Sequence, residues 1–220
     1  MDQNGNFKIF SCKPAEYLAK EVCDIIGMSL SRTDVKDFSN KEFKPVPADT
    51  TRGFTAYLFQ SYSGDPSRDH MEELLEIDAL KRAGAKEIWL VNTSPSWQRQ
   101  DRRDESRSPI SAKVVANNRM INGIAGFITY RLHNPAIEGF YDCPVINLSG
   151  NPILYEHLKD KITKPIEWLA VSPDAGGVAA AMKYAKYHGI RNMGNGFKFR
   201  PDDDNISEIV GFSHSLDSLD

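Results

Sequence analysis

The feature that most constrains this chain is a regular alternation between short apolar runs and longer stretches with helical periodicity. The runs FKIFSC (7–12), TAYLFQS (55–61) and EIWLVN (87–92) have the length and composition of buried strands. Between the first two, apolar residues recur at helical spacing from Ala15, just after Pro14, to Ile26, and Gly27 follows them. Strands that alternate with helices predict a mainly parallel sheet covered on both faces, which is the α/β class.

The same alternation continues to the end of the chain. We expect Asp69 to cap a helix that ends near Gly84 and turns four apolar residues toward the core, namely Met71, Leu74, Leu75 and Ala79. Further helices are expected at 109–122, 151–161 and 176–188, and further strands at 126–132, 144–148, 167–172 and once more after Arg200. The Ser-Gly-Asn-Pro stretch at 149–152 predicts a hinge, so we expect two domains, 1–148 and 149–220.

Composition excludes several classes of function. The net charge is −3 over 220 residues, with the cations spread along the chain, so no patch predicts binding to nucleic acid or to an anionic membrane. Three cysteines, Cys12, Cys23 and Cys143, form no CxxC pair, which indicates reduced thiols rather than disulfides or zinc ligands. With no signal peptide and no spanning segment in the sequence, we expect a cytoplasmic protein.

The segments that follow the expected strands carry the chemistry, because ligands of open α/β sheets bind at the carboxyl ends of strands. After the strand at 87–92 comes WQRQDRRDESRSPI, in which four arginines surround three acids. Arginine forks suit phosphate oxygens, so this loop is a candidate nucleotide-binding segment. The alternative is a solvated loop whose charges satisfy each other.

Two later segments have similar alternatives. In VSPDAGG (171–177), Asp174 is a candidate for holding Mg²⁺ or a ribose hydroxyl beside two glycines, or it is only the N-cap of the next helix. In FKFRP (197–201), Lys198 and Arg200 lie on the same side of an extended segment, where two cations would stabilise a transferring phosphoryl group. The alternative is an edge strand protected by its lysine.

Two more positions complete the candidate site. His133 follows the expected strand at 126–132, where it would orient phosphates or bind a cation, or serve as a structural hydrogen-bonding residue. In DFSNKEF (37–43), Phe38 is suited to stack on a purine while Asn40 or Glu42 contacts its amino edge. Taken alone, the same segment is a turn between two short strands.

Together and in this order, these motifs resemble those of the ribose-phosphate pyrophosphokinase family, the phosphoribosyl pyrophosphate synthetases. The family's RFSDGE turn is DFSNKE here, its RQDRK/R loop is RQDRR at 99–103, and PI(S/T)AKVVA is PISAKVVA at 109–116. VSPDxGGV appears as VSPDAGGV at 171–178, and K-x-R-P as KFRP at 198–201. The resemblance covers the chain up to about Gly211.

This resemblance implies two units of the type I phosphoribosyltransferase fold, the second incomplete, in a homo-oligomer (a dimer or hexamer) with ATP between subunits. It implies that Phe38 stacks on adenine in a neighbour's site, that Asn40 and Glu42 contact the adenine edge, and that phosphates and ribose are held by Arg99, Gln100 and Asp101. It also implies that Mg²⁺ is contacted by His133 and Asp174, the latter also touching the sugar, and that the transferring phosphates are stabilised by Lys198 and Arg200. The reaction would move diphosphate from Mg-ATP to ribose 5-phosphate and release AMP.

Several positions depart from the family pattern. Asn40 replaces an acid, Arg131 stands where the family has Asp, and Ala136 stands where Gln is usual. TSPSWQR also replaces the usual PYxxYAR, and the sequence given stops before a loop of the type DDxxxTGGT, which holds the 5-phosphate of ribose. The sequence therefore leaves two hypotheses: a diphosphokinase acting on ribose 5-phosphate or a related acceptor, and an inactive homologue that regulates or assembles with a full-length synthetase. A shortened gene product or fragment is a third explanation of the early end.

Overall fold

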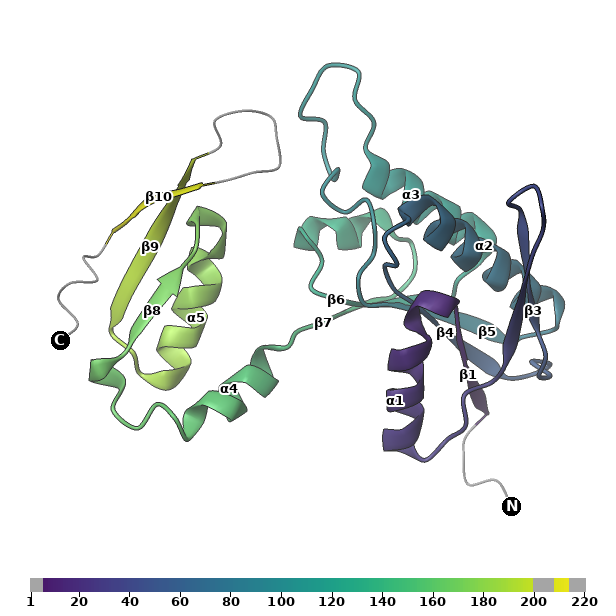
Figure 1. Ribbon diagram of the computed structural model, residues 1–220, viewed down its shortest axis with the longest axis horizontal. Coiled ribbons are helices and arrows are strands. Elements are labelled where there is room, and N and C mark those ends of the chain that lie inside the picture. The colour runs from purple at the N-terminus through teal and green to yellow at the C-terminus, as the bar shows by residue number, and fades with distance from the viewer. Residues whose placement is uncertain (1–5, 200–207, 214–220) are drawn as a thin grey trace. The chain divides into compact units, whose positions relative to one another are not determined.

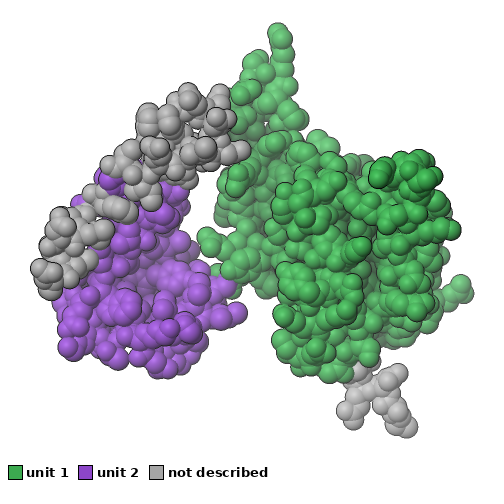
Figure 2. All heavy atoms as spheres, viewed as in Figure 1, with its two compact units in different colours: residues 1–149 green, residues 150–220 purple. Residues whose placement is uncertain are grey.

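The computed structural model describes residues 6–199 and 208–213, and it divides into two compact units, residues 1–149 and 150–220 (Figure 2). In the first unit the strands are β1 (Phe7–Ser11), β2 (Thr33–Asp37), β3 (Phe43–Pro47), β4 (Thr55–Gln60), β5 (Glu87–Asn92), β6 (Gly126–Tyr130) and β7 (Val145–Leu148). Its helices are α1 (Glu16–Ile26), α2 (Pro66–Arg82) and α3 (Ser111–Asn122), with 3₁₀ turns η1 (Lys13–Ala15) and η2 (Pro135–Phe140).

The first unit is built on a parallel sheet in the order β1-β4-β5-β6-β7. Alternate strand residues enter two separate cores, because successive side chains of a strand point to opposite faces. Phe10, Leu58 and Leu90 pack with Ile77 and Leu80 of α2 on one face. Ile9, Phe59 and Val91 pack with the buried small residues of α1 on the other. The helices thus lie on both faces of the sheet (Figure 1), which confirms the expected α/β class.

Helix α1 ends where the sequence predicts. Gly27 has a φ of 70°, in the left-handed region where a side chain is unfavourable, and the N–H of Met28 donates to the carbonyl of Cys23 at 2.9 Å. Cys12 and Cys23 are buried, Cys143 is half-buried, and all three thiols are free, as expected.

Helix α2 corrects two expectations. Its N-cap is Asp65, whose carboxylate accepts from the N–H groups of Ser67 and Arg68, and it begins before Asp69. Met71 and Leu75 are exposed, whereas the buried face carries four acids in addition to Ile77 and Leu80: Asp69, Glu72, Glu73 and Glu76. The sequence prediction assigned the apolar residues to the core, but here ion pairs and hydrogen bonds let carboxylates occupy the buried face.

Strands β2 and β3 form an antiparallel hairpin apart from the main sheet, with Lys36 opposite Lys44. The hairpin is attached to α2 at both ends. Near its base, Thr33 Oγ1 donates to Glu76 Oε1 at 2.7 Å. Near its tip, Arg68 Nη2 lies 2.6 Å from Asp37 Oδ1, and the Arg68 guanidinium lies 4.3 Å from the centroid of the Phe43 ring.

The second unit contains α4 (Asn151–Lys159), β8 (Leu169–Ser172), α5 (Val178–His188), β9 (Asn192–Phe199) and β10 (Glu208–Phe212), with 3₁₀ turns η3 (Pro165–Glu167) and η4 (Ala175–Gly177). Its sheet has the order β10-β9-β8, parallel between β8 and β9 and antiparallel between β9 and β10. Since β9 is the central strand, the edge-strand alternative for the Lys198 segment is wrong. Within the described residues, no helix has the length and apolar character needed to cross a bilayer.

Candidate functional site

The carboxyl ends of β5 and β6 carry most of the predicted site residues of the first unit. A cavity of about 570 Å³ lies there, which we call the loop cavity. Its lining includes Trp97, Arg99 and Gln100 from the segment after β5, and Arg131 and His133 from the segment after β6. The parallel sheet brings these two segments together because neighbouring parallel strands end at the same edge.

Hydrogen bonds fix the segment after β5 against the segment after β6. The backbone N–H of His133 donates to Gln98 Oε1 at 2.7 Å, and Asn134 Nδ2 donates to Asp101 Oδ2 at 2.7 Å. These bonds hold the chain on both sides of Arg99. Part of this loop, for which the sequence left open a nucleotide-binding role and a solvated surface role, therefore has a defined conformation.

Gln100 is held by the beginning of α3. Ser111 Oγ donates to Gln100 Oε1, and the N–H of Ala112 donates to the carbonyl of Gln100 at 3.1 Å. These contacts orient the backbone of the RQDRR motif. They also occupy the side-chain carbonyl of Gln100, so its free amide group is the part left to contact a ligand.

A second cavity, of about 270 Å³, shares Arg99 and His133 with the loop cavity. It also contains Asp101, Arg102 and Asp104. Among the described residues, the loop cavity is lined by two arginines, a histidine and several hydroxyl or amide side chains, and by no carboxylate. The two cavities thus differ in charge: the loop cavity suits an anion, whereas the second cavity mixes both signs.

The predicted adenine-binding residues lie elsewhere, at the tip of the β2–β3 hairpin. The N–H of Phe38 donates to the Glu42 carbonyl at 2.8 Å, and Asn40 Oδ1 accepts from the N–H of Glu42 at 3.2 Å. Asn40 thus stabilises the turn, while the Phe38 ring is 41% exposed. The lining of the loop cavity does not include Phe38, Asn40 or Glu42, so the chain by itself does not bring these residues to Arg99.

In the second unit, Asp174 is the N-cap of η4, with its Oδ1 accepting from the N–H of Gly177 at 3.0 Å. A Cβ at Gly177 would lie 2.5 Å from Ser172 Oγ, so glycine is required there by close packing within the turn. Lys198 lies on β9 opposite Ile209. Arg200 lies outside the described residues.

A buried polar network beneath the loop was not predicted from the sequence. Arg119 of α3 binds both carboxylate oxygens of Glu73, with Nε–Oε1 at 2.7 Å and Nη2–Oε2 at 2.9 Å. Arg119 Nη1 also donates to Tyr141 Oη at 2.8 Å, and Asn92 Nδ2 donates to Glu73 Oε2 at 3.0 Å. Asn92 ends β5, and its Oδ1 accepts from the N–H of Ser94, so the network fixes the start of the loop.

The buried polar network determines the pKa of Glu73. Burial by itself raises the pKa of Glu73, but Arg119 and His70 overcome this effect and lower the pKa to about 2. Glu73 is therefore ionised at neutral pH and neutralises Arg119. Hydrophobic periodicity considers only apolar residues, so it does not predict that acids occupy the buried face of a helix. The pair of Glu73 and Arg119 therefore left no signal in the sequence pattern.

Glu76, one turn further along α2, has the opposite environment. Burial raises its pKa to about 7, an effect that the hydrogen bond from Thr33 opposes and the nearby Glu72 reinforces. Its Oε2 is buried without a hydrogen-bond partner among the described residues. Glu76 is thus a buried carboxyl group that titrates near neutrality at the base of the hairpin.

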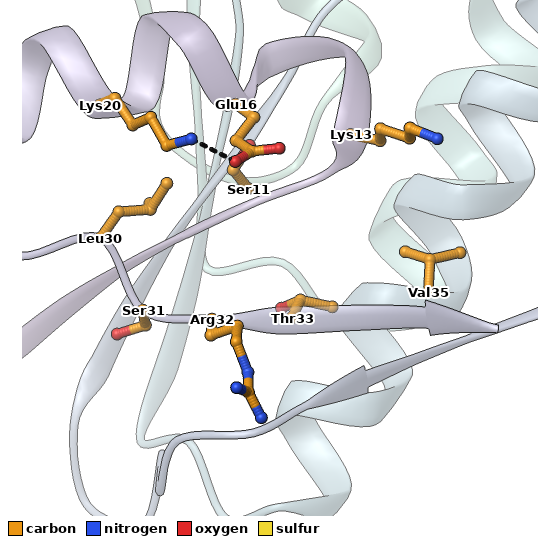
Figure 3. Close-up of a pocket in the computed structure, with 9 residues that line it drawn as sticks. All are labelled: Ser11, Lys13, Glu16, Lys20, Leu30, Ser31, Arg32, Thr33 and Val35. Atoms are coloured by element: carbon orange, nitrogen blue, oxygen red, sulfur yellow. Dashed lines mark hydrogen bonds and ion pairs between the residues drawn. The ribbon is translucent and has the colours of Figure 1, made fainter.

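A cavity of about 390 Å³ between α1 and β2 is shown in Figure 3. It contains Lys13, Lys20 and Arg32, but Lys20 is paired with Glu16, and Arg32 Nη2 lies 3.2 Å from Asp34 Oδ2. In Figure 3 the Lys20 and Glu16 side chains face each other, while Arg32 points away on the other side of the strand. Because two of the three cations are already paired, this cavity fits an anion less well than the loop cavity does.

These features define an α/β protein with a cation-lined cavity at the carboxyl edge of a parallel sheet. Residues 7–123 match the model of the N-terminal domain of ribose phosphate pyrophosphokinase. The chain belongs to the ribose-phosphate pyrophosphokinase family.

Individual relatives agree with this assignment. The chain is 44% identical over 181 residues to the ribose-phosphate pyrophosphokinase of Bacillus subtilis, covering 82% of this chain and 56% of that protein. It is 42% identical over 184 residues to the Staphylococcus aureus protein of the same name, covering 83% and 57%. The crystal structure of phosphoribosylpyrophosphate synthetase from Mycobacterium smegmatis is similar with a TM-score of 0.81 and 30% identity, over 94% of this chain and 67% of that one. The chain therefore spans somewhat more than half the length of these curated relatives.

Proposed function

We propose that this chain binds Mg-ATP at the loop cavity and transfers diphosphate to ribose 5-phosphate or a related ribosyl acceptor, giving AMP and phosphoribosyl pyrophosphate. The observation that carries this proposal is the charge of the loop cavity. Two arginines and a histidine line it, with no carboxylate from the part of the chain that the structure describes, at the edge of the sheet where α/β proteins bind ligands. Membership of the ribose-phosphate pyrophosphokinase family supports the reaction.

In this reaction the anomeric hydroxyl oxygen of the acceptor forms a bond to the β-phosphorus of ATP. The bond from that phosphorus to the α,β-bridging oxygen breaks, AMP leaves with the electron pair, and the hydroxyl proton is released. Arg99 would hold the phosphates from the loop, and Gln100 and Asp101 would contact the phosphates and ribose. Lys198 and Arg200 would stabilise the charge that develops on the transferring group, where cations contribute most to phosphoryl transfer.

Magnesium bound to ATP would neutralise phosphate oxygens and keep the reacting atoms in line. We assign its protein contacts to His133 and Asp174, with Asp174 also contacting the acceptor sugar. Among the described residues there is no group of three or more His, Cys, Asp or Glu side chains that would hold a metal alone. This fits magnesium, which in nucleotide sites is bound largely by phosphates and water with one or two protein groups.

The hairpin supports a shared site in a homo-oligomer. Phe38 is exposed at the tip of the hairpin and does not line the loop cavity of its own chain. We therefore assign Phe38, Asn40 and Glu42 to the adenine site of a neighbouring subunit. In this arrangement ATP binding depends on assembly of the chain with itself.

The proposal is tested by calorimetry with Mg-ATP and by an assay of AMP release with ribose 5-phosphate. We expect binding, AMP formed in proportion to the acceptor, and a fall in turnover on the order of 100-fold in Lys198→Ala with ATP affinity retained. Lys86→Ala is the control, because Lys86 is exposed and does not line the three cavities described above. Wild-type protein that binds Mg-ATP but forms no AMP would overturn the transferase activity and support the alternative, an inactive subunit that assembles with a full-length synthetase.

A further inference from the structure

Arg131 lines the loop cavity, and its backbone is fixed by the neighbouring strand. It follows β6 directly and has a φ of 49°, in the left-handed region that residues other than glycine seldom adopt. Its N–H donates to the carbonyl of Leu148, at the end of β7, at 3.0 Å. The neighbouring strand thus fixes the point from which the Arg131 side chain enters the lining of the cavity.

Within residues 6–199 and 208–213, no carboxylate forms an ion pair with the guanidinium of Arg131. Arg68, Arg82 and Arg119, by contrast, each have such a partner. The described lining of the cavity adds Arg99 and His133 and contains no acid. Repulsion between cations that share a cavity is relieved when an anion binds between them.

We propose that Arg131 binds a phosphate group of the nucleotide in the loop cavity, acting from the β6 side as Arg99 acts from the β5 side. This inference rests on the proposed ATP site and adds to it a phosphate-contacting residue at a position where the family has an acid. A guanidinium fork binds two phosphate oxygens at once, so Arg131 raises affinity for the phosphate chain rather than for the nucleoside.

The test compares Arg131→Ala, Arg131→Lys and Arg131→Asp with the wild type by calorimetry, using Mg-ATP, adenosine and inorganic tripolyphosphate as separate ligands. Loss of a charge-assisted hydrogen bond is expected to weaken Mg-ATP and tripolyphosphate binding on the order of 10-fold or more in Arg131→Ala. Arg131→Lys is expected to retain part of that affinity and Arg131→Asp to lose more. Any affinity for adenosine should be unchanged in all three.

Arg82→Ala is the matched control, because Arg82 lies on the surface of α2, paired with Asp78. Wild-type affinity for both phosphate ligands in Arg131→Ala would overturn the inference while leaving the ATP site in place. If the wild type binds tripolyphosphate in an Arg131-dependent way but not Mg-ATP, the proposed function fails and so does the assignment of the phosphate to a nucleotide, whereas the contact of Arg131 with phosphate stands. If the wild type binds neither ligand, both are overturned.

Discussion

At the scale of single residues, Glu73 and Glu76 show how one helix face can hold two carboxyl groups in opposite states. Glu73 is paired with Arg119 and stays ionised, with a pKa of about 2. Glu76 accepts one hydrogen bond from Thr33 and has a pKa of about 7. A buried pair with good geometry offsets the desolvation of its charges, whereas a buried acid without a cation is destabilised when it ionises.

The pH dependence of stability should report the state of Glu76. Its pKa is higher in the folded protein than in the unfolded chain, so its contribution is fully present below pH 4.5 and is lost as the pH rises through about 7. Glu76→Gln removes this loss. We expect the variant to gain about 1–3 kcal/mol over the wild type between pH 5 and pH 8.

Urea denaturation at the two pH values measures this gain, with Glu87→Gln, an exposed acid on β5, as the control. An equal difference between Glu76→Gln and the wild type at pH 5 and pH 8 would contradict the assignment.

At the scale of elements, the β2–β3 hairpin is the part whose position depends most on side chains. It shares no ladder with the main sheet, and its attachment to α2 includes the Thr33–Glu76 hydrogen bond and the Arg68 contacts to Asp37 and Phe43. The hairpin carries the proposed adenine-binding residues. The attachment of the hairpin to α2 therefore determines how firmly the proposed adenine-binding residues are held.

Arg68→Ala should loosen the tip of the hairpin without unfolding the sheet. The change removes the ion pair with Asp37 and the contact with Phe43, while the Thr33–Glu76 bond remains at the base. Hydrogen exchange measured by mass spectrometry should therefore accelerate over residues 33–47, most of all near the turn. Arg82→Ala, which removes another ion pair of α2, should leave that segment unchanged. The expectation is wrong if both variants exchange alike over the hairpin.

At the scale of the whole molecule, part of one face of the first unit's sheet, on β6 and β7, is apolar and is not covered by α1. Tyr130, Ile146 and Leu148 are 40%, 44% and 49% exposed, and the strand register places Tyr130 beside Leu148 and Ile128 beside Ile146. Adjacent exposed apolar side chains of this kind are typical of interfaces between protein chains. We predict that the proposed homo-oligomer forms through this face.

Ile146→Asp should therefore shift the protein toward monomers, because burying an unpaired carboxylate in an apolar interface is costly. Light scattering coupled to size-exclusion chromatography measures the mass, with Ile25→Asp as the control on the exposed side of α1. An assembly that persists unchanged in Ile146→Asp would place the interface elsewhere. Circular dichroism should show that both variants remain folded.

The sequence by itself determined the elements of this protein and the segments that carry chemistry. The alternation of apolar runs and helical stretches predicted the parallel sheet, and Gly27 marked the end of α1, because both depend on local periodicity and backbone preference. The rule that ligands bind at the carboxyl ends of parallel strands also pointed to Arg99 and His133, which the structure brings into one cavity. The roles assigned to the individual site residues remain predictions.

Only the tertiary structure decided which side chains are partners. Met71 and Leu75 have the right periodicity for a core face but are exposed. The buried face of α2 instead includes Glu73, whose partner Arg119 lies 46 positions further along the chain. Arg131 likewise became part of the site through the pairing of β6 with β7 and its closeness to the segment after β5. Burial of a charge is favourable only when a partner distant in sequence is present, so local sequence patterns do not reveal it.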